Sequence, residues 1–157
     1  MRSTSLPRVL RLAAVLAPAA LAAQPPASQR PLGTLREQAA LQQQWLERRM
    51  ATVLPALMRK HGVEMWVVPM REYAEDPVFT SIVSPTTFAA RRRTIYVFFD
   101  SGGSRPVERL ALGGTSQGGV YQAVRSTKPA AGPAGAAQQA QAELWGDEQW
   151  QVLRRVV

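Results

Sequence analysis

The sequence predicts an α/β domain, because a long amphipathic segment is followed by four short strand-like segments and then by a second amphipathic segment. The chain has 157 residues, of which 46% are hydrophobic, and it shows no internal repeat. This length and composition suit one domain with a buried core. We place that domain at residues 34–157.

The first helix is predicted to begin after Thr34. Thr34 and Glu37 form the Thr-x-x-Glu pattern of a capping box, in which each side chain accepts from the other residue's backbone N–H. Pro55, which has no N–H, predicts a kink, and His61-Gly62 predicts the end of the helix. Apolar side chains at three- and four-residue intervals predict its buried face: Leu46, Met50, Val53, Leu54, Leu57 and Met58.

Four segments have the composition of strands. Nearly continuous apolar runs at Glu64–Pro69 and Thr94–Phe99 predict strands that are covered on both faces. Val107–Leu112 and Val120–Val124 predict two further strands around a glycine-rich hairpin turn. A short helix and a loop are expected between the first two strands, within residues 76–88.

Residues 1–23 have the pattern of a signal peptide. Three arginines accompany a short apolar run, and a small-x-small cleavage site lies at residues 20–22. The run is short for a bilayer and Pro18 interrupts it, so no stable membrane anchor is expected. We therefore expect an exported protein, periplasmic or secreted. Because it has no cysteine, its stability must come from packing rather than from disulfides.

Two segments of biased composition and a second helix complete the chain. Residues 24–33 predict a flexible lead-in, and residues 129–142 predict a low-complexity loop without charge. Residues 144–157 predict a helix with Trp150, Leu153 and Val157 on one apolar side. Because the chain stops inside this helix, we expect the domain to be truncated at its C-terminus.

The positive charge is an indirect guide to partners. The formal net charge is +8, yet aromatic residues do not alternate with the basic clusters, so nucleic-acid binding is not expected. The densest cluster is Arg91, Arg92 and Arg93. It could bind a phosphate or a carboxylate. We favour a solvated start of a strand that meets a partner subunit or domain.

A serine-hydrolase pattern is present but lies in the wrong context. Gly114-Thr115-Ser116-Gln117-Gly118 matches the G-x-S-x-G nucleophile elbow, which requires a helix after the serine and a later histidine. A strand-like run follows Ser116, and the only histidine, His61, precedes it. A hydrolase that uses Ser116 is therefore the less favoured interpretation, and we assign no catalytic residue.

One cluster of carboxylates, Glu72, Glu75 and Asp76, could bind a cation or a substrate amine. The favoured alternative is a turn before Pro77, in which Asp76 caps the next helix. Metal sites in proteins usually use three or four converging ligands. With one histidine and no cysteine, the sequence gives no such set, and we assign no metal ligand.

The central segment carries a series of short stretches in order: Met65–Val68, Arg71–Tyr73, Glu75–Phe79, Pro85–Phe88 and Arg91–Ile95. With the later Glu143–Trp150 stretch, they resemble the N-terminal domain of an exported bacterial Xaa-Pro aminopeptidase, of the creatinase, aminopeptidase P and prolidase family. The resemblance runs from about Thr34 to the end of the chain.

The resemblance implies a three-layer α/β domain with a mixed central sheet flanked by helices. In such enzymes a C-terminal pita-bread domain holds two divalent metals, Mn or Zn, and cleaves the bond before proline. The N-terminal domain shapes the substrate entrance and makes subunit contacts. The contact residues expected here are Arg71, Glu72, Tyr73, Arg91, Arg92 and Arg93.

The pita-bread domain has no counterpart in this sequence, so none of its metal ligands is carried over. We expect a non-catalytic domain that is inactive alone. Its partner would be a second copy or the missing catalytic domain, and it would meet a peptide substrate only within a full-length parent. The alternative is a secreted binding or assembly module that uses the same contact residues.

Overall fold

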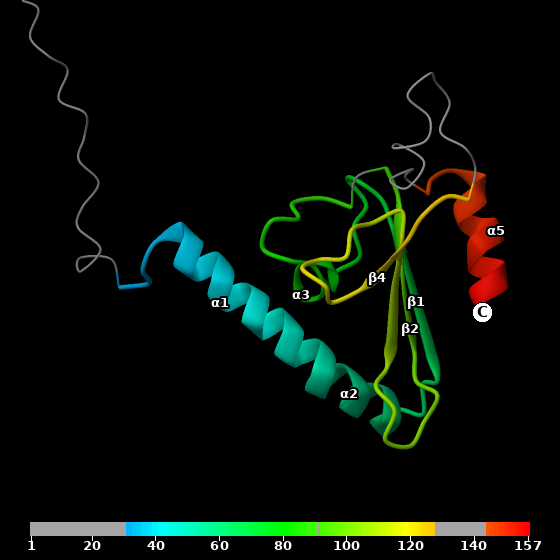
Figure 1. The fold of residues 1–157 in the computed structure, drawn as a ribbon, viewed down its shortest axis with the longest axis horizontal. Helices are drawn as coiled ribbons and strands as arrows, with labels where there is room; N and C mark the ends of the chain where they lie inside the picture. Colours follow the sequence, from blue (N-terminus) through cyan, green and yellow to red (C-terminus); the bar gives the residue numbers. More distant parts are fainter. Residues whose placement is uncertain (1–30, 91, 128–143) are drawn as a thin grey trace, which may run out of the picture.

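The computed structural model describes residues 31–90, 92–127 and 144–157. The predicted signal peptide, most of the lead-in, Arg91 and the segment 129–142 lie outside the described residues. Figure 1 shows how the described elements are arranged. In chain order they are α1 (Leu35–Arg48), the π-helical turn η2 (Arg49–Val53), α2 (Leu54–Lys60), β1 (Met65–Met70), α3 (Phe79–Ile82), β2 (Thr94–Phe99), β3 (Glu108–Leu112), β4 (Gln122–Val124) and α5 (Asp147–Val156).

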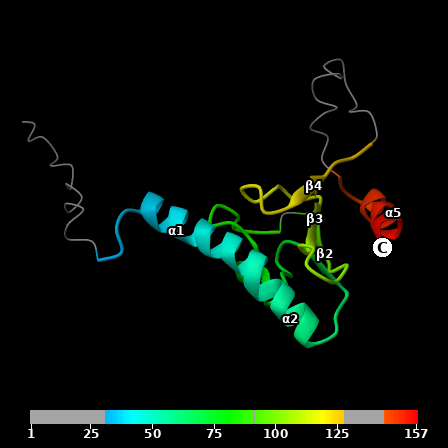
Figure 2. The same cartoon turned by 60° about the horizontal axis from the view of Figure 1, so that its bottom comes forward.

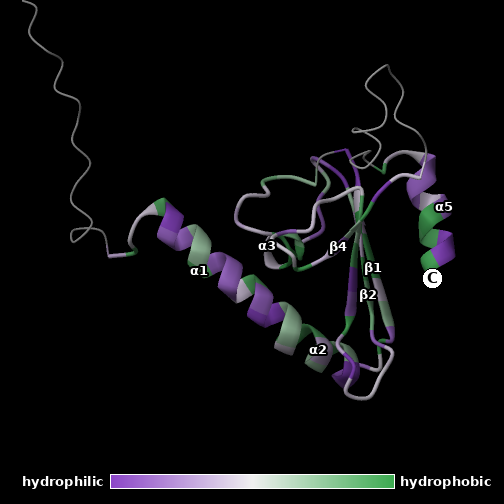
Figure 3. Ribbon diagram, viewed as in Figure 1, coloured by the Kyte–Doolittle hydropathy of each residue, from purple (hydrophilic) through white to green (hydrophobic). Residues whose placement is uncertain are grey.

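The predicted α/β class and its mixed sheet are confirmed. The four strands lie in the order β1-β2-β3-β4. The β1–β2 and β2–β3 pairs are antiparallel, whereas the β3–β4 pair is parallel. In Figure 3 the strands β1 and β2 are mainly hydrophobic, while α1 and α5 alternate between hydrophilic and hydrophobic turns.

Helices cover both faces of the sheet, which gives three layers. Alternate residues of a strand point to opposite faces. Tyr96 and Phe98 of β2 belong to the core that includes α1, η2, α2 and α3, whereas Ile95 and Val97 belong to the core that includes Leu144 and α5. Figures 1 and 2 show α1 and α2 on one side of the sheet and α5 on the other.

The start of the first helix follows the prediction. The Thr34 hydroxyl accepts from the Glu37 N–H at 3.2 Å, and the Thr34 N–H donates to the Glu37 carboxylate at 2.6 Å. At the other end, His61 follows the last residue of α2 and Gly62 has a φ of 65°. The capping box and the glycine stop therefore set both ends of the helical segment.

The buried face of this segment is narrower than predicted. A column of side chains at four-residue intervals is buried: Leu46, Met50, Leu54 and Met58. Val53 and Leu57 were predicted to be buried with them, but they are 47% and 50% exposed. In a regular α-helix, each four-residue step turns the side chain by about 40°. The wider turn η2 offsets this drift and keeps the column facing the sheet.

The discontinuity predicted at Pro55 takes the form of this π-helical turn. The Leu54 N–H donates to the Arg49 carbonyl, five residues back. In that register Pro55 would pair with the Met50 carbonyl, but proline has no N–H. The Met50 carbonyl accepts instead from Arg109 Nη1 at 3.1 Å, and Arg109 Nε donates to the Val120 carbonyl at 2.9 Å. Arg109 therefore ties the helix to the chain before β4.

Two strand predictions need correction. β2 has the predicted bounds and is buried at every position except Phe99. β1 was predicted to be covered on both faces, but it is an edge strand and is only partly buried. The glycine-rich connection is not a hairpin turn, because β3 and β4 are parallel. Residues 113–121 instead return the chain to the end of the sheet where β3 starts.

α5 is present as predicted, but only one of the three side chains predicted for its apolar side, Leu153, packs against the core. Trp150 and Val157 are exposed, whereas Gln149 and Val152 are buried. The Gln149 amide donates to the Arg93 and Leu112 carbonyls at 3.0 and 3.1 Å. Hydrogen bonds at the strand ends therefore set the orientation of this helix. The spacing of apolar residues does not reveal such bonds.

None of the helices in the described ranges has both the length and the apolar content to cross a bilayer.

The docking of α5 generates a stability prediction at Gly113, which has a φ of 79°. A Cβ there would overlap Gln149 Nε2 and lie 2.6 Å from the Leu144 carbonyl oxygen. Gly119, with a φ of 91°, has nothing within 4 Å of the same position. We predict that Gly119→Ala costs about 1–2 kcal/mol, the cost of a left-handed alanine. Gly113→Ala should cost about 2 kcal/mol more, because α5 must also move.

Urea unfolding of the two variants, followed by circular dichroism, measures the difference. Gly119→Ala is the matched control, since it carries the same backbone cost without the overlap. Equal losses of stability would show that the position of α5 does not depend on Gly113.

Candidate functional site

Several of the stretches that carry the resemblance lie at one end of the sheet. Met70 pairs with Thr94, so the end of β1 lies beside the start of β2. Leu112, the last residue of β3, pairs with Ile95. We call this region, around the end of β1, the start of β2 and the end of β3, the upper sheet end, because it lies at the top of Figure 1.

The predicted contact residues Arg71, Glu72 and Tyr73 form an exposed turn at this end. The Ala74 N–H donates to the Arg71 carbonyl at 2.9 Å, and the Arg71 N–H reaches the Ala74 carbonyl at 3.5 Å. Tyr73 has a φ of 63°, which is uncommon for a residue with a side chain. Its side chain is 94% exposed. The turn therefore holds an aromatic ring in solvent.

Arg92 and Arg93, two of the predicted contact residues, each lie against a tryptophan of the same chain. Their guanidinium groups lie over Trp145 and Trp150, with 5.4 and 5.2 Å between the guanidinium carbon and the ring centroid. Such cation–π contacts hold α5 against the start of β2. The two arginines thus contact α5 and the residues just before it, and their contact with a partner stays a prediction. The third arginine, Arg91, lies outside the described residues.

The clustered carboxylates serve the local backbone. Glu75 Oε1 accepts from the Ala90 N–H at 3.2 Å, and Asp76 Oδ1 accepts from the Val78 N–H at 3.0 Å just before α3. Glu72 is exposed in the turn. Among residues 31–90, 92–127 and 144–157, no three His, Cys, Asp or Glu side chains come together. The described residues therefore do not fit the metal centre of the resembled family.

A pocket of about 570 Å³ opens at the upper sheet end. It lies between the loop at residues 86–89, the start of β2 and the loop that follows β3. Phe88 lines it and is 90% exposed. Its polar lining is mostly neutral, with one cation: Thr86, Thr87, Thr94, Tyr96, Thr115, Gln117 and Arg125.

Gln117 organises the wall of this pocket from a buried position. Its Oε1 accepts from the Ser84 N–H and from the Thr87 hydroxyl, both at 2.8 Å. Its Nε2 donates to the Tyr96 hydroxyl at 3.3 Å. Its backbone carbonyl accepts from Gln43 Nε2 of α1 at 3.1 Å. One side chain therefore joins the loop before the pocket, β2 and the glycine-rich loop, and its backbone reaches α1.

Sequence reasoning missed Gln117, because it treated this residue as an unspecified position of the hydrolase pattern. Its backbone φ is 52°, and Gly118 and Gly119 beyond it also have positive φ. The glycines indicate a tight turn. No local pattern indicates that the amide of this particular residue is buried, because its partners come from segments more than 20 residues away.

The tyrosines beneath the pocket are neutral. Burial raises the pKa of Tyr96 to about 12, so its phenol keeps its proton at neutral pH. Burial also raises the pKa of Tyr121, whose hydroxyl donates to the Ile82 carbonyl at 2.7 Å. The pocket can therefore offer hydrogen bonds and the charge of Arg125 to a polar ligand. Its described lining contains no paired nucleophile and base.

The hydrolase pattern is not assembled as an active site. Ser116 is exposed, and its carbonyl accepts from the Gly119 and Tyr121 N–H groups at 3.1 and 3.0 Å. A turn and β4 follow it, whereas the elbow requires a helix. His61 lies before the start of β1, at the opposite end of the sheet from Ser116.

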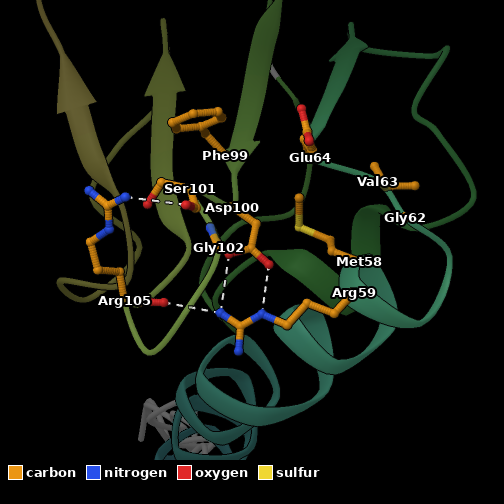
Figure 4. A pocket seen from close by; sticks show the side chains of 10 residues that line it. All are labelled: Met58, Arg59, Gly62, Val63, Glu64, Phe99, Asp100, Ser101, Gly102 and Arg105. Carbon is orange, nitrogen blue, oxygen red and sulfur yellow. Dashed lines mark hydrogen bonds and ion pairs between the residues drawn. The ribbon is translucent and has the colours of Figure 1, made fainter.

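A second pocket, of about 560 Å³, lies at that opposite, lower end (Figure 4). Arg59 Nε and Nη2 contact the two Asp100 carboxylate oxygens at 2.8 and 3.1 Å, and Nη2 also donates to the Arg105 carbonyl at 3.1 Å. The hydrogen bonds from Arg59 lower the pKa of Asp100, and the same pairing raises the pKa of Arg59. This bidentate pair joins α2 to the end of β2.

Comparisons of the chain with protein-family models, with curated proteins and with solved structures found no match.

The network around Gln117 generates a stability prediction. Gln117→Met keeps the volume of the side chain but leaves the Ser84 N–H and the Thr87 hydroxyl without their acceptor. We predict a loss of about 2–3 kcal/mol in the free energy of unfolding. Thr87→Val, which removes a single hydroxyl, should cost about 1 kcal/mol. Urea unfolding decides the order, and a Gln117→Met variant as stable as the natural protein would refute the organising role.

The Arg59–Asp100 pair generates a pH prediction. The folded-state pKa of Asp100 lies below the unfolded value of about 3.9, so the pair stabilises the fold above that pH. Its contribution is lost as the pH falls through the lowered folded-state pKa. Asp100→Asn should therefore lower the urea midpoint at neutral pH, and the gap to the natural protein should close as the pH falls through that lowered pKa.

Glu72→Gln is the control for this series, because Glu72 is an exposed carboxylate at the other end of the sheet. Its urea midpoint should match that of the natural protein at every pH. A gap for Asp100→Asn that stays constant across the acid range would contradict the assignment.

Proposed function

We propose that this chain is a non-catalytic α/β domain of an exported, Xaa-Pro aminopeptidase-like metallopeptidase, and that it works by contacting the catalytic domain or another subunit. The observation that carries the proposal is the pair of aromatic side chains at the upper sheet end. Tyr73 and Phe88, both within the stretches that resemble the family, are 94% and 90% exposed.

The chemistry of this end suits a contact with protein. Tyrosine and arginine are enriched at protein–protein contacts, where a few aromatic anchors supply most of the binding energy. Arg71 and Glu72 precede Tyr73 in the same turn and are exposed. Charges at the rim of a contact orient the partner more than they add affinity. Tyr73 and Phe88 are the proposed anchors, and Arg71 and Glu72 the proposed orienting charges.

The polar groups that line the pocket beside Phe88 support a positioning role rather than a chemical one. Gln117 Oε1 already accepts two hydrogen bonds, and the Thr94 hydroxyl donates to the Ala90 carbonyl at 2.9 Å. These groups fix the loops that carry Phe88. In the proposed parent protein, two divalent metals, Mn or Zn, would be held by the pita-bread domain. This chain would shape the entrance for the peptide substrate, in the periplasm or outside the cell.

The first arm of the test is activity. We expect the purified chain, supplied with Mn²⁺ or Zn²⁺, to release no N-terminal residue from Xaa-Pro peptides. Metal-dependent cleavage by this chain alone would contradict the non-catalytic role.

The second arm is binding to a separately expressed pita-bread domain of a two-domain Xaa-Pro aminopeptidase, measured by titration calorimetry. Replacing Tyr73 and Phe88 together by serine should weaken binding at least about tenfold, which corresponds to about 1.4 kcal/mol. The matched control is Leu57→Ser, an exposed apolar position on α2 at the lower end. Absence of binding by the natural chain, or equal weakening by the control, would refute the proposed contact.

A further inference from the structure

The outer edge of β1 carries backbone groups that no described strand pairs. β1 is the first strand of the sheet and its strand partner is β2. The Asp100 N–H donates to the Glu64 carbonyl at 2.8 Å, one position beyond the ladder. In an antiparallel pair, every second residue bonds the partner strand. Residues 66, 68 and 70 therefore face β2, and Met65, Val67 and Pro69 direct their N–H and C=O groups outward.

Two further observations agree with this alternation. Arg71, the next residue in the outward series, donates its N–H away from β2 to the Ala74 carbonyl. Pro69 has no N–H and stands at an outward position, which is where a strand tolerates proline. The free edge therefore spans residues 65–69. It offers two N–H donors, those of Met65 and Val67, and it ends at the turn that holds Tyr73.

Within the residues that the structure describes, this edge lacks most of the features that protect edge strands from pairing. Proteins commonly protect them with charged side chains, bulges or a covering element. Met65-Trp66-Val67-Val68-Pro69 has no charge, and Met65, Trp66 and Val67 are only half-buried. Pro69 removes one donor but leaves both others. An uncharged strand can pair with an identical strand without repulsion between like charges.

We propose that a second copy of this chain adds its β1 antiparallel to this edge, so that the two four-stranded sheets become continuous. With the two-fold axis at Val67, each Val67 N–H donates to the Val67 carbonyl of the other copy. Each Met65 N–H then donates to the other copy's Pro69 carbonyl, while each Met65 carbonyl, which faces a proline without an N–H, receives no bond from the other strand. The two-fold axis repeats each of these bonds in both copies.

This assembly would specify one subunit contact of the proposed function. Its biological purpose rests on that proposed function. The turn with Tyr73 closes one end of the free edge, so the second copy would lie next to the upper sheet end. A contact of five residues per strand is small, so association is expected to be weak and to depend on protein concentration.

Amide hydrogen exchange of the whole chain, resolved by residue with NMR, tests the proposal directly. The Trp66 and Val68 amides should be protected at every concentration, because they bond β2. The Met65 and Val67 amides should exchange rapidly in dilute protein and at least about tenfold more slowly in concentrated protein. A chain that stays monomeric by light scattering, or a dimer in which these two amides exchange at an unchanged rate, would overturn the proposal.

A pair of variants gives an independent test. Val67→Pro removes one outward N–H and leaves the bonds to β2, so it should weaken self-association at least about tenfold. Val67→Thr keeps the N–H and should associate like the natural chain. Undiminished association of a folded Val67→Pro variant would overturn the proposal. If that variant fails to fold, the exchange measurement on the natural chain decides.

The outcomes separate this inference from the proposed function. Failure of the edge contact leaves binding to the pita-bread domain, and its dependence on Tyr73 and Phe88, as it was. Loss of that binding with an intact edge dimer would refute the proposed function alone.

Discussion

The fold depends on the burial of β2 on both of its faces. Tyr96 and Phe98 enter one core while Ile95 and Val97 enter the other, and all four side chains are almost completely buried. The same strand pairs with β1 and β3. It is therefore the described element that joins both helical layers to the sheet. A strand in this position must be apolar along nearly its whole length, which explains the composition of Thr94–Phe99.

The layer on the α5 side depends on polar geometry as well as on apolar area. The Gln149 amide reaches two carbonyls at the ends of β2 and β3, and Gly113 leaves the space that it needs. Among the described residues, Arg93 Nη1 and Gln149 Oε1 are buried without a hydrogen-bond partner. Unpaired buried groups reduce the net gain of such a contact. We infer that this arrangement fixes where α5 lies more than it adds to stability.

Local signals in the sequence predicted the elements whose cause is local. The capping box, the glycine stop and the buried strand at residues 94–99 each depend on neighbouring residues, and each is confirmed. The edge position of β1 and the parallel direction of β4 depend on pairing between distant segments. Composition does not encode that pairing, because Met-Trp-Val-Val has the same apolar character at an edge as in the centre of a sheet.

The candidate site could be predicted only in part, because only part of it depends on neighbouring residues. The exposure of Arg71, Glu72 and Tyr73 follows from a polar turn after a strand, and they were predicted as contact residues. The contact of Arg92 and Arg93 with two tryptophan rings was not predictable, because those tryptophans lie about 50 residues later in the chain. Gln117 was missed for an equivalent reason, since its partners come from other segments.

The two ends of the sheet differ in how they are closed. At the lower end, the Arg59–Asp100 pair joins the helix to the strand directly. At the upper end, the buried Gln117 amide holds Ser84 and Thr87, which leaves the neighbouring Phe88 projecting into solvent. Two backbone hydrogen bonds between Arg71 and Ala74 likewise hold the turn that exposes Tyr73. A side chain on a fixed backbone loses less freedom on binding than one on a mobile loop. The buried network is therefore the physical link between the core of the domain and the contacts proposed for its surface.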